Sequence, residues 1–132
     1  MVMQIINCLV IIDEYLKGIL GQILTSYKLL TELNDNPNDL DTLKKELSKI
    51  KGLLQVISIK LDNKKYQSDH LVTLYKLATY YNITYDYTRE IEMLAQIYYN
   101  DSSRLKNLRL LIINSLNDKK LIEKIQTILI EL

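Results

Sequence analysis

The sequence predicts an all-α protein, an elongated antiparallel four-helix bundle in which residues 1–132 form a single domain. Three observations support this prediction. Apolar residues recur at alternating steps of three and four, the spacing of helices that pack lengthwise against one another. Clusters of turn-forming residues interrupt this spacing at three places. The segments between the interruptions have similar lengths, and short connections between them favour antiparallel neighbours.

The first helix is expected over residues 3–33 and the second over residues 39–61. Between them lies Asn34-Asp35-Asn36-Pro37-Asn38, a dense turn cluster that contains the only proline. Asp39 is expected to cap the second helix. The apolar seam of the first helix consists of Ile5, Leu9, Ile12, Leu16, Ile19, Ile23, Leu30 and Leu33. The seam of the second helix consists of Leu40, Leu43, Leu47, Ile50, Leu54, Ile57 and Leu61.

The third helix is expected to start at Ser68 or Asp69, after a loop over residues 62–67, and to continue to about Tyr99. Residues 100–103 then end it and cap a fourth helix that reaches the C-terminus. The first, third and fourth helices would each be about 45 Å long at 1.5 Å per residue.

Two segments within the third and fourth helices are poor helix formers. Residues 82–87 are rich in β-branched and aromatic side chains, and residues 114–118 contain Asn, Ser and Asp. Neither segment contains glycine or proline, so we expect kinks. If one or both segments break instead, the bundle has five or six helices.

Composition indicates a globular protein with no membrane association, because 48% of the residues are hydrophobic and 25% are charged. The apolar opening, residues 1–12, is too short to span a membrane and lacks the features of a signal peptide. The only cysteine, Cys8, cannot form an intramolecular disulfide, which favours a reducing, cytoplasmic location. Abundant Ile, Lys, Asn and Tyr indicate an AT-rich genome, such as that of a virus or a low-GC microbe.

The sequence offers no catalytic, cofactor-binding or metal-binding group, so we expect that the protein is not an enzyme. His70 is the only histidine, and Cys8 lies in an apolar run without a neighbouring histidine. The carboxylates of Asp13-Glu14 and of Glu90 and Glu92 point to different faces of a helix. Gly18, Gly21 and Gly52 lie inside helical patterns rather than in a phosphate-binding loop.

Surplus apolar surface predicts that the protein binds a partner chain or a second copy of itself. A four-helix bundle covers one stripe of each helix, yet apolar residues point in several directions in three of the expected helices. Tyrosines are abundant between residues 75 and 99, and tyrosine is enriched at interfaces. A continuous third helix would place Tyr80, Tyr87 and Tyr98 in one row. The predicted partner interface comprises Val56, Ile59, Tyr80, Tyr87, Tyr98, Leu110 and Ile113.

Charge is distributed unevenly along the chain. Residues 1–41 contain two lysines and six acids, a net −4, and residues 42–132 contain fifteen Lys and Arg against ten acids, a net +5. Because clustered cations are the basis of nucleic-acid binding, the basic part is a candidate surface for a polyanion. Lys45, Lys49 and Lys51 lie off the apolar seam and are the candidate contacts.

Two short segments carry a family resemblance. They are Ser48-Lys49-Ile50-Lys51-Gly52-Leu53-Leu54 and Leu74-Tyr75-Lys76-Leu77-Ala78-Thr79-Tyr80. The first resembles a basic-apolar helix, and the second a Lys-Leu-Ala-Tyr stretch, of the small helical subunit of type III CRISPR effector complexes. The resemblance implies an all-helical subunit stacked along a ribonucleoprotein filament, with basic side chains on the RNA.

The leading hypothesis is a non-catalytic helical assembly protein that associates with itself or packs into a larger complex, for example as a viral structural subunit. The first alternative is an RNA- or DNA-binding small subunit of a ribonucleoprotein complex of the CRISPR type. The second alternative is an inhibitor that seizes a helix of a host protein in a groove. The sequence identifies neither the partner nor the number of copies.

Overall fold

The computed structural model describes the backbone of residues 2–62 and 68–131, and the side chains of these residues from Glu14 onward. This part of the chain contains six α-helices, one short 3-10 helix and no strand. The elements are α1 (Val2–Glu32), α2 (Asp39–Leu61), α3 (Asp69–Thr84), α4 (Thr88–Gln96), α5 (Ser102–Asn117), η1 (Asp118–Lys120) and α6 (Leu121–Glu131).

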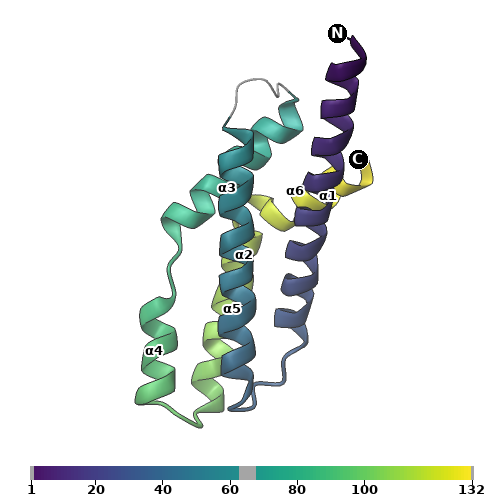
Figure 1. Ribbon diagram of the computed structural model, residues 1–132. Helices are drawn as coiled ribbons and strands as arrows, with labels where there is room; N and C mark the ends of the chain where they lie inside the picture. Colours follow the sequence, from purple (N-terminus) through teal and green to yellow (C-terminus); the bar gives the residue numbers. More distant parts are fainter. Residues whose placement is uncertain (1, 63–67, 132) are drawn as a thin grey trace.

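The helices form an antiparallel bundle of four columns, two of which are broken (Figure 1). α1 and α2 are the two unbroken columns and form a helical hairpin. The third column consists of α3 and then α4, which pack against different stretches of α2. The fourth consists of α5 and then α6, and α6 packs against α1 and α3. The predicted all-α antiparallel bundle is therefore confirmed, and both doubtful segments break rather than kink.

The break between α3 and α4 is stabilised by local hydrogen bonds. Tyr85 has an extended backbone (φ −113°, ψ 123°), which ends α3. The carboxylate of Asp86 then accepts hydrogen bonds from the backbone N–H of Thr88 (3.0 Å) and from its hydroxyl (2.7 Å). Such short-range bonds compete with a continuous helix. The predicted single helix up to Tyr99 is therefore wrong, and α4 itself ends at Gln96.

The break between α5 and α6 has a different cause. Lys119 (φ 54°) and Lys120 (φ 61°) are two successive residues in the left-handed region, which is uncommon for residues other than glycine. They follow the end of α5 at Asn117 and turn the chain so that α6 runs across the bundle toward α1 (Figure 1).

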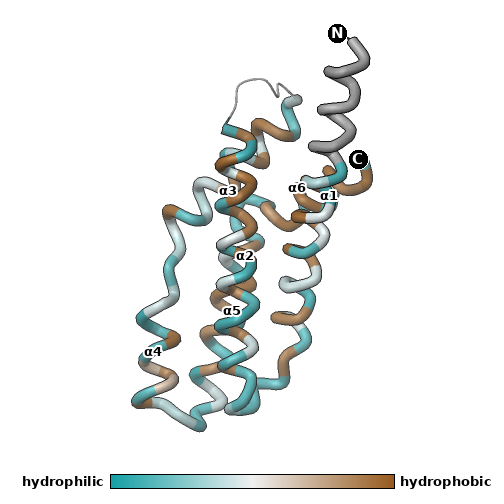
Figure 2. Tube along the Cα trace, viewed as in Figure 1, coloured by the Kyte–Doolittle hydropathy of each residue, from teal (hydrophilic) through white to brown (hydrophobic). Residues whose placement is uncertain are grey.

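The predicted seams form the core. In α2, the predicted seam residues from Leu43 to Leu61 are buried, and Leu40 is half-buried. In α1, Leu16, Ile19, Ile23 and Leu30 are buried, whereas the side chains of Ile5, Leu9 and Ile12 lie outside those described. Apolar and hydrophilic positions alternate along α2, as one buried stripe requires (Figure 2).

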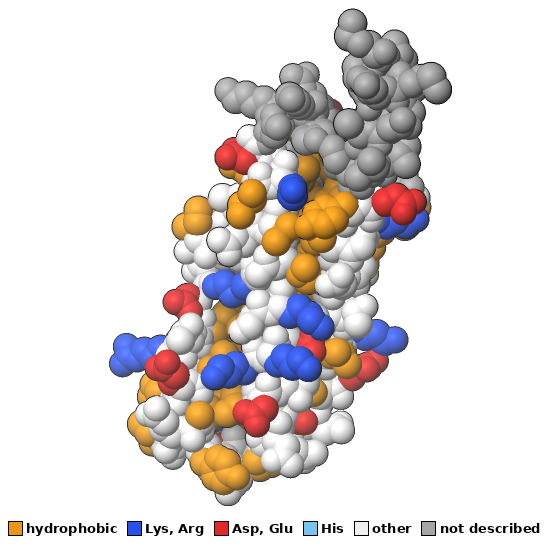
Figure 3. Space-filling model, viewed as in Figure 1, with side chains coloured by type: hydrophobic (Ala, Val, Ile, Leu, Met, Phe, Trp, Pro, Cys, Tyr) orange, Lys and Arg blue, Asp and Glu red, His pale blue; other side chains and the backbone are white. Residues whose placement is uncertain are grey.

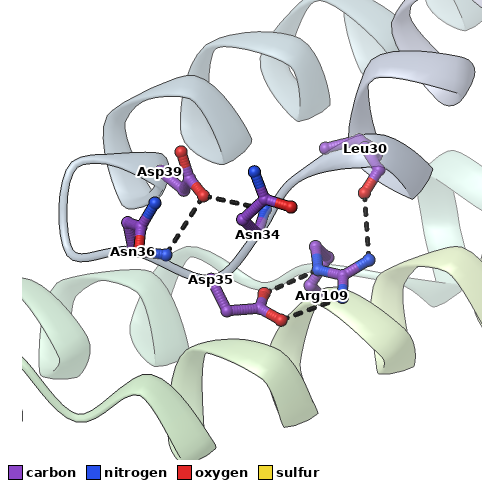
Figure 4. Close-up of polar contacts among 6 residues, drawn as sticks. All are labelled: Leu30, Asn34, Asp35, Asn36, Asp39 and Arg109. Carbon is purple, nitrogen blue, oxygen red and sulfur yellow. Dashed lines mark hydrogen bonds and ion pairs between the residues drawn. The ribbon is translucent and has the colours of Figure 1, made fainter.

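The loop between α1 and α2 is fixed by side-chain contacts (Figure 4). Asp39 is the first residue of α2 rather than its cap, and its Oδ2 accepts the backbone N–H groups of Asn34 (3.0 Å) and Asn36 (3.1 Å). Arg109 of α5 donates through Nε (2.7 Å) and Nη2 (2.9 Å) to the carboxylate of Asp35, and through Nη1 to the carbonyl of Leu30. This buried pair attaches α5 to the end of the α1–α2 hairpin.

The N-terminal cap expected for the fourth helix is present at the start of α5. The carboxylate of Asp101 accepts the backbone N–H of Arg104 at 3.1 Å and caps α5. Within the described ranges, no helix is both long enough and apolar enough to cross a membrane.

Candidate protein-interaction surface

α4 is attached to the bundle by few side chains. Of its residues only Ile91 and Leu94 are buried, together with Tyr87 immediately before it. Open grooves lie on both sides of the helix, one of about 370 Å³ toward α2 and one of about 350 Å³ toward α5. α4 therefore borders two grooves that are open to a partner.

The groove between α4 and α5 is predominantly apolar. Met93, Leu94 and Tyr98 contribute from the α4 side, and Leu108 and Leu111 from α5. Leu111 is 52% exposed, and it lines this groove together with four other apolar side chains.

Further apolar side chains are exposed on α5 and on the turn that follows α4. The turn after α4 exposes Ile97 (67%) and Tyr99 (68%), and Leu110 of α5 is also exposed. Hydrophobic side chains are visible over the lower end of α4 and the turn that follows it (Figure 3). We call the apolar residues that line this groove, Met93, Leu94, Tyr98, Leu108 and Leu111, the α4–α5 surface.

The two rims of the groove carry opposite charges. Glu90 lies on the α4 rim, is exposed, and forms no ion pair with any described residue. Arg104 lies on the α5 rim, where its Nε donates to Asp101 at 3.1 Å and its guanidinium carbon lies 3.7 Å from the centre of the Tyr98 ring. The Nη groups of Arg104 have no hydrogen-bond partner in the described part of the chain.

The residues of the predicted partner interface differ in how far they are exposed. Tyr87 is only 7% exposed, so its assignment to a partner surface is wrong: the break at residues 85–87 turns it into the core. Val56 and Ile113 are half-buried against the core, which corrects their expected outward orientation. Ile59 (66% exposed) and Leu110 do lie at the surface, but on different helices, α2 and α5.

The remaining two tyrosines lie apart from each other. Tyr98 lines the α4–α5 groove, and Tyr80 is half-buried on α3. The expected single row of Tyr80, Tyr87 and Tyr98 does not exist because the helix that would align them is interrupted. The sequence prediction does not include Met93, because a continuous helix gives no reason to separate α4 from the rest of the third helix.

Tyrosines instead connect the two breaks. The hydroxyl of Tyr85 donates to Asp118 at 2.6 Å, and that of Tyr80 does so at 3.4 Å. The hydrogen bond from Tyr85, followed by those from Tyr80 and the backbone of Lys119, lowers the pKa of Asp118 despite partial desolvation. The same bond raises the pKa of Tyr85. Asp118 therefore joins the α3–α4 break to the α5–α6 break.

The predicted nucleic-acid contacts separate into two kinds. Lys45 and Lys49 are exposed on α2, and Lys44 adds a third exposed lysine to the same helix. Lysine and arginine side chains gather over α2 on the face shown in Figure 3. Lys51, in contrast, donates to the carbonyl of Tyr85 at 2.5 Å and holds the α3–α4 break against α2.

His70 joins two helices through polar contacts at both of its ring nitrogens. His70 lies between Lys124 (Nζ to Nδ1, 2.8 Å) and Glu131 (Oε2 to Nε2, 3.0 Å), which connects the first turn of α3 to the end of α6. Because lysine only donates, Nδ1 accepts and Nε2 carries the proton given to Glu131. The described residues contain no group of three or more side chains that could hold a metal ion.

Comparison with known proteins finds no family model that matches the sequence, no matching curated protein and no matching solved structure. The resemblance to the small subunit of type III CRISPR complexes therefore stays a prediction.

Proposed function

We propose that this protein is a non-catalytic helical assembly protein that associates with further copies of itself through the α4–α5 surface. The observation that carries the proposal is the open apolar groove between α4 and α5, with Leu111 exposed along it. Single exposed apolar residues are common on monomers, but a contiguous group beside a groove is typical of an interface. A cytoplasmic location, based on the single cysteine, belongs to the same proposal.

Two further properties support association between copies. The formal net charge of +1 gives little repulsion between identical chains. Tyr98 lines the groove with an aromatic side chain, and tyrosine is among the residues enriched at interfaces.

Sedimentation velocity at about 10–100 µM, the range of weak assemblies, tests the proposal. We expect concentration-dependent dimers or larger species for the wild type. Leu111→Glu should abolish them because it buries a charge in the contact. Ile130→Glu is the matched control, because Ile130 is 86% exposed on α6, and it should leave association unchanged. A wild-type protein that stays monomeric throughout contradicts the proposal.

A second candidate function, binding of RNA or DNA within a complex, is favoured by the lysines of α2. Lys44, Lys45 and Lys49 are exposed, and none forms an ion pair with a described residue. Between residues 42 and 61 the only acid is Glu46, which is buried. A basic face of this kind suits phosphate groups.

Binding of single-stranded RNA measured at several salt concentrations tests this candidate. Replacing Lys44, Lys45 and Lys49 with alanine should weaken binding and reduce the salt dependence. The matched control replaces the exposed Lys76, Lys106 and Lys120, which gives the same net charge. Equal loss in both triple variants would show a general charge effect rather than a site on α2.

A further inference from the structure

We infer that two copies associate about a two-fold axis, with Glu90 on the α4 rim of each copy facing Arg104 on the α5 rim of the other. This inference rests on the proposed function and specifies its geometry. It commits the α4–α5 groove to one occupant, a second copy of this chain.

The argument begins from the symmetry of a dimer contact. In a two-fold interface the same patch is used by both copies, so each group must meet its complement on an identical surface. The groove has Glu90 on one rim and Arg104 on the other, with apolar residues between them. A half-turn about an axis in the contact plane, perpendicular to the line from Glu90 to Arg104, places acid opposite base at both rims, with Leu111 and Met93 covered between them.

The guanidinium of Arg104 is already held in one orientation within a single copy. Its Nε is occupied by Asp101 and its guanidinium lies over the Tyr98 ring, which fixes the orientation of the group. The Nη groups are left to donate to a carboxylate, and arginine pairs with carboxylates through two parallel hydrogen bonds. A side chain already held in place loses less conformational entropy on binding.

Glu90 is the complementary group. It is exposed, has no ion-pair partner among the described residues, and lies on the same groove as Arg104. The other exposed acid of α4, Glu92, lines the groove toward α2 instead, so it does not belong to the proposed contact.

Charge reversal tests the geometry. Glu90→Arg and Arg104→Glu should each weaken self-association about tenfold or more, because each replaces two attractive contacts by two repulsive ones. An equimolar mixture of the two variants should restore association, since each rim contact of the mixed dimer again joins one basic and one acidic side chain. The double variant should also self-associate. Sedimentation equilibrium and native mass spectrometry measure the dissociation constant and the composition of the dimers.

Controls separate this inference from the proposed function. Glu123→Arg makes the same charge change at an exposed position on α6 and should leave the dimer intact. Circular dichroism melts verify that Arg104→Glu, which also loses Asp101 as partner, remains folded. A wild-type dimer that is insensitive to both charge reversals, or is not restored in the mixture, overturns the two-fold contact. A monomeric wild type overturns the proposed function as well.

Discussion

Arg109 is one of the few charged side chains buried in the described part of the chain, and all of its contacts join distant segments. It forms a bidentate pair with Asp35, and only 10% and 13% of the two side chains are exposed. A buried charge that loses its partner is strongly destabilising. This pair therefore fixes where the α1–α2 loop lies on α5.

Asp35→Asn is predicted to lower the free energy of unfolding by about 3 kcal/mol, because it removes the carboxylate that pairs with Arg109 and leaves only the weaker electrostatic attraction of Asp39. Asparagine tolerates the left-handed backbone of Asp35 (φ 64°), so the effect reports on charge rather than on strain. Urea denaturation measures it. The exposed pair Lys28–Glu32 provides the control, since Glu32→Gln should change stability by less than about 0.5 kcal/mol. Equal effects of the two substitutions would contradict the prediction.

Tyr81 determines part of the alkaline stability. Burial raises the pKa of Tyr81 to about 12, while hydrogen bonding to Ser115 acts in the opposite direction. An unfolded tyrosine titrates near pH 10. The folded state is therefore favoured fully below pH 10, and this contribution is lost as the pH rises from about 10 to about 12.

Tyr81→Phe should reduce the loss of stability over this range by about 2 kcal/mol. At pH 7 it should cost only about 1 kcal/mol or less, because Ser115 keeps its hydrogen bond to the carbonyl of Ile112. Tyr85 leaves a residual loss, because its pKa is also raised. Urea denaturation at pH 7, 10 and 12 measures both values. An unchanged alkaline profile would show that Tyr81 does not titrate with unfolding.

At the scale of the elements, the apolar seams can be predicted from the sequence because the spacing of core residues repeats along each helix. Leu43, Leu47 and Ile50 follow one rule, and that rule needs no knowledge of distant residues. The sequence predicts the breaks between α3 and α4 and between α5 and α6 less well. Lys119 and Lys120 carry no glycine signal for a left-handed turn, and Lys51 contacts the Tyr85 carbonyl across 34 positions of sequence.

The interaction surface shows the same limitation. The sequence indicated surplus apolar side chains, but it could not tell which of them would be covered by neighbouring helices. Leu110 proved exposed and Ile113 half-buried, although both lie on α5. The prediction for Tyr87 is wrong because the 100° rotation per residue of a helix does not continue through the break between α3 and α4.

Gly52→Ala is predicted to stabilise α2 by about 1 kcal/mol and to raise the melting temperature by about 3–5 °C. Gly52 lies inside the helix, and a Cβ atom there would meet no described atom within 4 Å. The gain arises from the reduced entropy of the unfolded chain. Thermal melts followed by circular dichroism measure the shift, and Gly18→Ala should give a similar one. A loss of stability would contradict the prediction.

For the whole molecule, association and folding are linked. A dimer that only the native protein can form stabilises the native protein by mass action. The melting temperature of the wild type should therefore rise when the protein concentration increases from about 5 µM to about 500 µM. Leu111→Glu should remove this dependence and leave the melt at low concentration nearly unchanged. A wild-type melt that is independent of concentration would argue that the α4–α5 surface does not bind a second copy.

The tyrosine cluster at the two breaks has a practical consequence. The chain contains ten tyrosines but neither tryptophan nor phenylalanine. The rings of Tyr81 and Tyr87 lie 5.1 and 6.3 Å from that of Tyr85. Near-ultraviolet dichroism reports on aromatic rings held in fixed packing. The near-ultraviolet signal of these tyrosines therefore reports on packing where the two broken columns meet. Loss of that packing can be followed without attaching a dye.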